Sequence, residues 1–198
     1  MDIKQRISQI LRAEADAISA VKVTPAFEQA VEALYRCSGK VITTGMGKAG
    51  LMAKKFATTL SSTATPAAFI HPAEAAHGDL GLLDERDVVV AFSTSGKSRE
   101  VVGMLEMSRH LKIGTIIGIT SHPDSQLREL SNIIIDMGII EEVCPLGLTP
   151  TSSTIVMLAI SDALAITLME LKGITKKDYY IRHHGGYLGR KARSDNVS

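Results

Sequence analysis

The sequence has no tryptophan and only four phenylalanines and four tyrosines. This shortage predicts an aliphatic core, and it argues against the aromatic surfaces on which single-stranded nucleic acids stack. The sequence also has almost no excess of charge, since 22 basic and 21 acidic side chains leave a net charge of +1. Such a balance is typical neither of nucleic-acid-binding proteins nor of acidic disordered chains. We therefore expect no nucleic-acid partner and favour a small-molecule ligand.

Cysteine is scarce as well, with Cys37 and Cys144 far apart and no CxxC pair. The first residues mix Asp2, Lys4 and Arg6 with apolar side chains, which is unlike a signal peptide. Both thiols are therefore expected to be reduced, in a cytoplasmic protein. The longest uncharged stretch, residues 143–161, contains two prolines and several hydroxyl side chains, so we expect no membrane span.

What the chain does contain is an ordinary globular composition, with 45% hydrophobic and 22% charged residues in 198 positions. A chain of this size can bury a core as a single domain, residues 1–198. Short apolar runs without polar alternation indicate strands buried on both faces, and their alternation with helical stretches predicts an α/β fold with a parallel sheet. The expected strands are residues 41–44, 67–70, 88–92, 115–120 and 133–135. The expected helices are residues 2–20, 25–37, 49–61, 98–111, 125–130 and 151–171, followed by a flexible tail at 192–198.

Ligands of such sheets bind where the carboxyl ends of strands meet helix N-termini, so the loops there are informative. The first expected strand ends in Gly45-Met46-Gly47-Lys48-Ala49-Gly50, which fits the G-x-G-x-x-G pattern of dinucleotide sites. The acidic residue that would bind the ribose is missing, because His71-Pro72 follows the second strand. A Walker loop is excluded by the short spacing before Lys48 and by Ala49, which cannot bind magnesium. We interpret the turn as a phosphate or oxyanion loop, with simple backbone packing as the alternative.

The loop after the third strand is rich in hydroxyl groups, carried by Ser93, Thr94, Ser95 and Ser98. Together with backbone N–H groups at a helix N-terminus, they can bind a phosphate monoester. Ser98 could instead cap the helix, but capping explains only one of the four hydroxyls. Glu100 lies in the first turn of the same helix, and its position alone favours compensation of the helix dipole.

Two further loops carry titratable side chains. His71 and His77 lie in a segment bounded by proline and glycine; their spacing fits no standard zinc motif, but such histidines can act as acids or bases near neutral pH. Glu142 precedes the long helix and is a candidate base because its loop should reach the same sheet edge. Cys144 in that loop is interpreted as a structural thiol. Finally, His183 lies among glycines near the end of the chain, which indicates a constrained backbone.

Five motifs taken together closely resemble the sugar isomerase (SIS) domain of bacterial D-arabinose 5-phosphate isomerases. They occur in order across residues 45–191 and read GMGKAG, HPAEAAHGDLG, STSGKSRE, EVCPLGLTPTSST and HHGGYLGRK. The resemblance implies a five-stranded parallel sheet between helices and a homotetramer. It also implies interconversion of D-ribulose 5-phosphate and D-arabinose 5-phosphate through a cis-enediol, without a metal or organic cofactor. The product would supply Kdo for lipopolysaccharide or capsule.

The same resemblance suggests roles for individual residues. The hydroxyl loop would bind the phosphate together with Thr65 and the first glycine loop, and His71 matches a position where an inhibitory zinc has been placed. The positions implied in catalysis are Lys48, His77, Glu100, Glu142 and His183. Lys48 would stabilise the developing negative charge. The residues leave open whether His77 or His183 is the base, and whether Glu100 or Glu142 assists ring opening or proton shuttling.

Three departures from the family pattern add expectations. The sequence has no CBS domains after the SIS domain, which predicts a catalytic domain without nucleotide sensing on the same chain. The family usually has HPGG where His183-His184-Gly185-Gly186 stands, and Lys97 replaces an acid in the phosphate loop. Because His183 follows the last helix, we expect it to complete the active site of a neighbouring subunit. The alternatives are another phosphosugar isomerase, such as a 6-phospho-3-hexuloisomerase, and a non-catalytic phosphosugar-sensing module.

Overall fold

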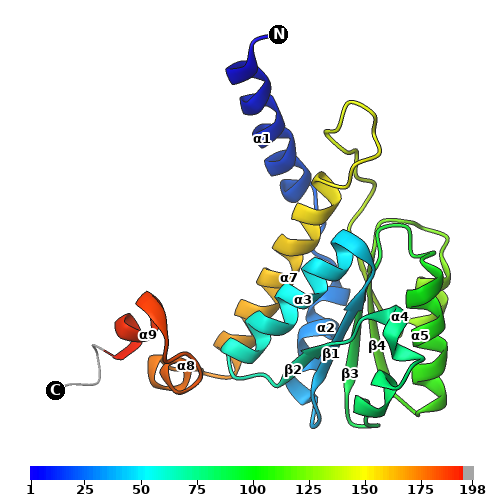
Figure 1. Cartoon of the computed structure of the whole chain (residues 1–198), viewed down its shortest axis with the longest axis vertical. Helices are drawn as coiled ribbons and strands as arrows, with labels where there is room; N and C mark the ends of the chain where they lie inside the picture. The colour runs from blue at the N-terminus through cyan, green and yellow to red at the C-terminus, as the bar shows by residue number, and fades with distance from the viewer. Residues whose placement is uncertain (194–198) are drawn as a thin grey trace.

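The computed structural model describes residues 1–193 and shows a five-stranded parallel sheet with the order β2-β1-β3-β4-β5 (Figure 1). The expected α/β architecture is confirmed, and each predicted strand is present within a residue or so of its expected bounds. The strands are β1 (Val41–Gly45), β2 (Ala67–Phe69), β3 (Val88–Phe92), β4 (Thr115–Thr120) and β5 (Ile133–Asp136). This order changes direction between β1 and β3, and such switch points are where parallel sheets bind ligands.

Helices cover both faces of the sheet, each above its own hydrophobic cluster. One face packs against α2 (Pro25–Arg36), α3 (Gly47–Ser62) and α7 (Ser152–Leu171), and its cluster includes Leu34, Phe56 and Leu164. The other face packs against α4 (Pro72–Ala75), η1 (Asp79–Leu82), α5 (Arg99–His110) and α6 (Gln126–Leu130). Successive side chains of a strand point to opposite faces, so β1 sends Val41 into the first cluster and Ile42 into the second.

The helices at the two ends of the chain project from this body (Figure 1). The N-terminal helix α1 (Ile3–Ser19) has no buried residue, although its apolar side chains lie at helical spacing as predicted. At the other end, α8 (Lys176–Arg182) and α9 (Gly186–Arg193) follow the C-terminus of α7. The α9 helix extends two residues into the segment 192–198 that was predicted to be a tail, and residues 194–198 lie outside the described part.

Within residues 1–193, α7 is the one helix whose length and apolar composition would suffice to cross a membrane. In this fold it lies in the core instead, where Val156, Ile160 and Leu164 are almost completely buried against the first cluster. A core helix of a globular protein has the same composition as a membrane span. Packing in the core therefore accounts for the buried face of α7, whereas Ile166 and Leu171 on its outer face are exposed.

Candidate functional site

The hydroxyl loop after β3 folds into a tight turn beside the N-terminus of α5. The Ser93 Oγ accepts a hydrogen bond from the Gly96 N–H at 3.1 Å and lies 3.1 Å from the Ser98 Oγ. The Lys97 N–H donates to the Ser95 Oγ at 3.2 Å. Ser98 occupies the N-cap position of α5, but its side chain makes no capping hydrogen bond. The hydroxyls thus gather around the turn, as an anion site requires, and capping does not explain Ser98.

The glycine loop after β1 is shaped largely by close packing. A Cβ on Gly45 would lie 3.0 Å from the carbonyl oxygen of Phe92, and one on Gly50 would lie 2.4 Å from the carbonyl oxygen of Gly45. Gly47 has a positive φ of 59° where α3 begins. The packing interpretation therefore accounts for Gly45 and Gly50. The exposed Lys48 in the first turn of α3 has no hydrogen-bond or ion-pair partner among the described residues, so its charge is available to an anion.

The two loops lie next to each other at the switch point of the sheet. Gly45, the last residue of β1, pairs with Phe92, the last residue of β3. The chain then enters α3 on one side and the hydroxyl loop on the other, which brings Lys48 and Glu100 to the same edge as the hydroxyls. Glu100 is exposed in the first turn of α5. One edge of one chain thus combines hydroxyl groups, a lysine and a carboxylate.

The two loop histidines follow β2 at the same edge of the sheet. His71 occupies the N-cap position of α4, and its ring meets that of Phe69 edge-on at 6.4 Å. The Nδ1 atom of His71 is buried and has no hydrogen-bond partner among the described residues. His77 lies exposed between α4 and η1. Residues 1–193 contain no group of three or more metal-binding side chains, so a zinc site at His71 stays a prediction.

Glu142 lies at the N-terminus of α7, where its carboxylate replaces the missing helix cap. Its Oε2 accepts hydrogen bonds from the Thr151 N–H at 2.7 Å, the Thr151 hydroxyl at 3.1 Å and the Ser153 N–H at 3.4 Å. Burial alone would raise the pKa of Glu142, but the hydrogen bonds from Ser153 and Thr151 outweigh it and lower the pKa below its usual value. The carboxylate is therefore ionised at neutral pH, which allows it to accept a proton but makes it a poor proton donor.

Cys144 is more acidic than a structural thiol would be. Hydrogen bonds from the side chain and backbone of Thr149, and from the backbone of Leu148 and Leu146, lower its pKa to about 6. The thiol is partly exposed. Since these donors, the Thr149 side chain first among them, come from its own loop, the low pKa reflects local hydrogen bonds and not a paired catalytic base.

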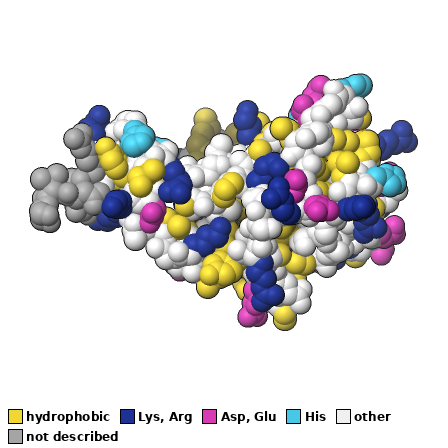
Figure 2. Space-filling view, turned by 90° about the horizontal axis from the view of Figure 1, so that it is seen from below, with side chains coloured by type: hydrophobic (Ala, Val, Ile, Leu, Met, Phe, Trp, Pro, Cys, Tyr) yellow, Lys and Arg dark blue, Asp and Glu magenta, His cyan; other side chains and the backbone are white. Residues whose placement is uncertain are grey.

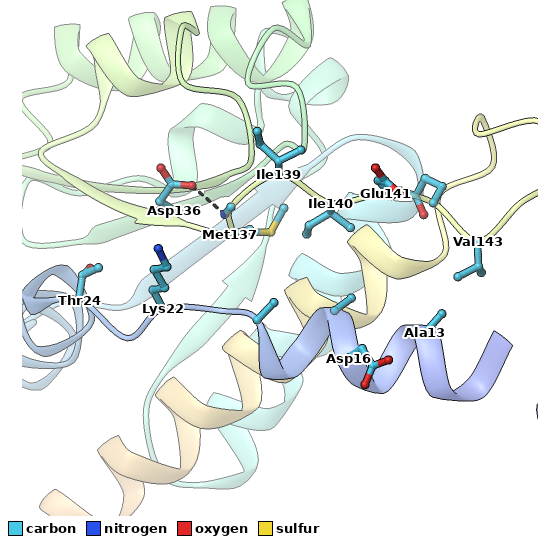
Figure 3. A pocket seen from close by; sticks show the side chains of 14 residues that line it. Ala13, Asp16, Lys22, Thr24, Asp136, Met137, Ile139, Ile140, Glu141 and Val143 are labelled. Carbon is cyan, nitrogen blue, oxygen red and sulfur yellow. Dashed lines mark hydrogen bonds between the residues drawn. The ribbon is translucent and has the colours of Figure 1, made fainter. Parts of the chain in front are cut away.

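A groove of about 890 Å³ lies beside Glu142, between α1 and the segment that follows β5 (Figure 3). Its walls come from α1, from the linker between α1 and α2, and from residues 136–143. At one end of it the Gly138 N–H donates to a carboxylate oxygen of Asp136 at 2.8 Å. The hydroxyl loop, residues 93–98, contributes nothing to this lining. The groove and the candidate anion site are therefore separate features of the chain.

Two of the predicted site residues do not reach this edge within one chain, and Thr65 is the first. It precedes β2, and the carbonyl of the next residue, Pro66, accepts a hydrogen bond from the Val41 N–H at the start of β1. The Thr65 hydroxyl accepts a hydrogen bond from the Lys172 Nζ at 2.9 Å. Within one chain Thr65 therefore does not reach the hydroxyl loop, and its role at the phosphate stays a prediction. A parallel strand begins at the amino edge of its sheet, so the residue just before β2 lies a strand length from the loop.

His183 is the second residue that lies elsewhere. It ends α8, and its ring stacks on that of Tyr179 with 5.2 Å between the centroids. Figure 1 shows α8 and α9 at the C-terminal end of α7, whereas Glu142 caps its N-terminal end. A 20-residue helix spans about 30 Å. Within one chain, His183 therefore does not meet Lys48 or Glu100.

The end of β4 and the segment after it also reach the hydroxyl loop, although no residue there was predicted to do so. The Thr120 hydroxyl donates to the carbonyl of Thr94 at 3.1 Å, and Ser125 packs against Gly96. The available signal was the pair Thr120-Ser121, which ends the strand beside β3 and so reaches the same edge. Hydroxyl groups at the carboxyl end of a neighbouring strand indicate a contact with the loop, even where no sequence motif surrounds them.

A parallel sheet with a hydroxyl-rich turn and an unpaired lysine at its switch point defines the class: an α/β protein with a candidate anion site at the carboxyl edge of its sheet. The family model of the SIS domain matches residues 34–167. The chain belongs to the SIS domain family. The expectation drawn from the five motifs is confirmed at this level.

The chain is also similar to individual characterised proteins. It is 40% identical to the arabinose 5-phosphate isomerase KdsD of Yersinia pestis over 96% of its own length and 58% of that protein, so it spans little more than half of this curated relative. A proposed phosphosugar isomerase of Bacteroides fragilis, involved in capsule formation, is 44% identical with a TM-score of 0.90, over 93% of this chain and 99% of that one. An Escherichia coli CFT073 protein in complex with arabinose 5-phosphate is 35% identical with a TM-score of 0.86, over 92% and 97% of the two chains.

Proposed function

We propose that this chain is the isomerase domain of a D-arabinose 5-phosphate isomerase, which interconverts D-ribulose 5-phosphate and D-arabinose 5-phosphate. The observation that carries the proposal is the hydroxyl turn beside the N-terminus of α5, with the unpaired Lys48 on the neighbouring loop. The similarity to curated isomerases over almost the whole chain supports it. So does the arabinose 5-phosphate bound by a relative with the same fold.

The phosphate would lie against the hydroxyl turn. Hydroxyl groups of Ser93, Ser95 and Ser98 and the backbone N–H groups of the turn can donate to it, and the positive end of the α5 dipole favours an anion there. The carbonyl end of the sugar would then extend towards Lys48. Because the ammonium group has no competing partner among the described residues, it can stabilise the enediolate oxygen as charge develops.

The reaction itself requires proton transfers only. A base removes the proton from the carbon next to the carbonyl, giving a cis-enediolate, and a second group moves a proton between the two oxygens. Glu100 lies at the same edge as Lys48, and His77 follows β2 at that edge, so one chain can supply both groups. Glu142 would take part as a carboxylate, since the donors at the N-terminus of α7 keep its pKa low. No step of this sequence needs a metal or organic cofactor.

We propose further that the active enzyme is a homotetramer in which His183 completes a neighbour's site. Its distance from the carboxyl edge leaves a partner chain as the route by which it can reach Lys48. The terminal helices have the exposed apolar surface that such assembly needs: more than half of each of Ile3, Ile7 and Leu11 on α1, and of Tyr187 on α9, is accessible. Figure 2 shows hydrophobic side chains interspersed with Lys and Arg at the end of the molecule that carries α8 and α9.

The cellular context extends the same proposal. D-Arabinose 5-phosphate would supply Kdo for lipopolysaccharide or capsule in the cytoplasm. The capsule alternative has the support of the Bacteroides fragilis relative, whose description links it to capsule formation.

In the decisive experiment, the purified protein is incubated with D-ribulose 5-phosphate in deuterated water, and NMR follows the products. We expect arabinose 5-phosphate that carries deuterium on the carbon next to the carbonyl, because an enediolate exchanges its proton with solvent. Lys48→Met, purified in the same way, should form product roughly a hundredfold more slowly, which controls for contaminating isomerases. Binding of the sugar phosphate without exchange would contradict the enzyme and favour a sensing module. Turnover of a hexulose 6-phosphate alone would contradict the substrate.

A further inference from the structure

The backbone of the hydroxyl turn accepts hydrogen bonds from the end of β4, from the segment that follows it and from the start of α6. The carbonyl of Thr94 accepts two hydrogen bonds, from the Thr120 hydroxyl and from the Ser121 N–H, each at 3.1 Å. The carbonyl of Gly96 accepts a third, from the Leu127 N–H at 3.1 Å. Thr120 is completely buried. Two of the peptide groups in the turn are thus oriented by another element of the fold.

The orientation of these carbonyls determines where the following N–H groups point. A planar trans peptide directs its C=O and its N–H to opposite sides, and residues 1–193 contain no cis peptide bond. With the carbonyl of Thr94 directed towards Thr120, the N–H of Ser95 points away from β4. The Ser95 N–H has no hydrogen-bond partner among the described residues, and Ser95 itself is partly exposed. It is a donor directed towards the open side of the turn.

Close packing leaves the turn little freedom to rotate away from this arrangement. Gly96 adopts a positive φ of 62°, and a Cβ at this position would lie 2.3 Å from the Ser125 Oγ and 3.1 Å from the Thr120 Oγ1. The segment after β4 therefore touches the turn through both hydrogen bonds and van der Waals contact. Of these contacts, the Thr120 hydroxyl is the one from a side chain to a carbonyl of the turn. The same hydroxyl accepts a hydrogen bond from the His122 N–H at 3.4 Å, so a substitution that deletes it removes these two hydrogen bonds and leaves the backbone contacts in place.

We propose that Thr120 is a positioning residue for phosphate recognition: its hydroxyl holds the Thr94–Ser95 peptide so that the Ser95 N–H donates to the phosphate of the substrate. The inference rests on the proposed function in one respect only, namely that the turn binds a phosphate group. It assigns Thr120 no contact with the ligand. It adds to the hydroxyls of residues 93–98 a backbone donor whose direction is set by a neighbouring strand.

The test compares Thr120→Val, which removes the hydroxyl at nearly constant volume, with Thr120→Ser, which keeps it. Thr43→Val is the matched control, because the Thr43 hydroxyl also donates from a buried strand position to a backbone carbonyl, that of Ala53, at 2.8 Å. We expect Thr120→Val to raise the KM for ribulose 5-phosphate, and the Kd for inorganic phosphate measured by titration, roughly fivefold to tenfold. The kcat should change less than about threefold. Thr120→Ser should stay near wild type, and Thr43→Val should lower Tm without changing either constant.

The phosphate titration separates the inference from the proposed enzyme activity. If the wild type binds phosphate but does not turn over the sugar, the proposed function fails, and weaker phosphate binding by Thr120→Val would still support the role of Thr120. Equal phosphate binding by the wild type and a folded Thr120→Val would overturn the inference. So would equal losses in Thr120→Ser and Thr120→Val, or a wild type that binds neither phosphate nor sugar phosphate. If Thr120→Val does not fold, Thr120→Ala takes its place in the same phosphate titration, with Thr120→Ser again as the variant that keeps the hydroxyl.

Discussion

The carboxyl edge of the sheet and the C-terminal pair α8–α9 are built in opposite ways. At the edge, the hydroxyl turn is anchored by the buried Ser93, by packing at Gly96 and by hydrogen bonds from the segment after β4. The α8 helix has no buried residue and is stabilised by a capping box between Thr175 and Asp178. One chain therefore preforms the candidate anion site, whereas the position of His183 relative to that site depends on what the terminal helices pack against.

The largest effect on activity should come from substituting one residue in each region, Lys48 at the carboxyl edge and His183 after α8, and then mixing the two variant chains. We expect Lys48→Met and His183→Ala each to lower kcat/KM by roughly a hundredfold or more, since each would remove a group that acts in the transition state. If sites are shared, a co-refolded equal mixture of the two variants should recover about a quarter of wild-type activity, because each site draws the two groups independently from two chains.

The control for this complementation is a mixture of Lys48→Met with Glu100→Ala. Both residues lie at the carboxyl edge of the same chain, so their mixture should remain inactive. Steady-state assays measure the activity of each mixture, and light scattering measures the mass of the particle and so the number of subunits in it. An active Lys48→Met with Glu100→Ala mixture, or a fully active monomer, would break the proposed division between the two regions.

A smaller but still large effect is expected from the turn itself. In Gly96→Ala, the positive φ costs about 1–2 kcal/mol and the new methyl group overlaps the Ser125 hydroxyl, so the turn must shift. A shift of about 1 Å would lower kcat/KM on the order of a hundredfold. Gly103→Ala, within α5 and with no atom near its Cβ position, should instead leave kcat/KM unchanged and raise Tm slightly. Unchanged activity in Gly96→Ala would show that the turn is not preformed.

The smallest effect concerns Glu142 and its dependence on pH. Because its pKa is lower in the folded protein, ionised Glu142 stabilises the fold above the ordinary glutamate value of 4.5, and this contribution is lost as pH falls through the lowered pKa. Glu142→Gln should therefore reduce the free energy of unfolding at pH 7 by about 1 kcal/mol, the value of a helix cap. Glu141→Gln is the control, because Glu141 is the exposed neighbour and its substitution should leave the free energy of unfolding nearly unchanged. A Tm difference between Glu142→Gln and wild type that does not shrink as the pH falls from 7 to below 4.5 would contradict this assignment.

Much of the carboxyl edge could be predicted because its signals are local. Apolar runs such as 88–92 indicate buried strands, and a loop that follows one of them must lie at the carboxyl edge in a parallel sheet. The positions of Lys48 and Ser93 follow from this rule alone. The position of Thr65 at the amino edge of its own chain could not be predicted from the resemblance, because a motif does not say at which end of a strand, or from which subunit, a residue reaches a ligand. Thr120 was missed because its partner, Thr94, is 26 residues away in the sequence.

Hydrophobic patterning thus determined the α/β class, the strands and the edge at which phosphate chemistry should occur, since burial and periodicity are encoded by neighbouring residues. Only the tertiary structure decided the rest. It showed that the Glu142 carboxylate accepts hydrogen bonds at the N-terminus of α7, that the Thr120 hydroxyl donates to the carbonyl of Thr94 in the turn, and that His183 lies beyond the far end of α7. These relations join residues that are distant in the chain, and their geometry depends on how whole elements pack together.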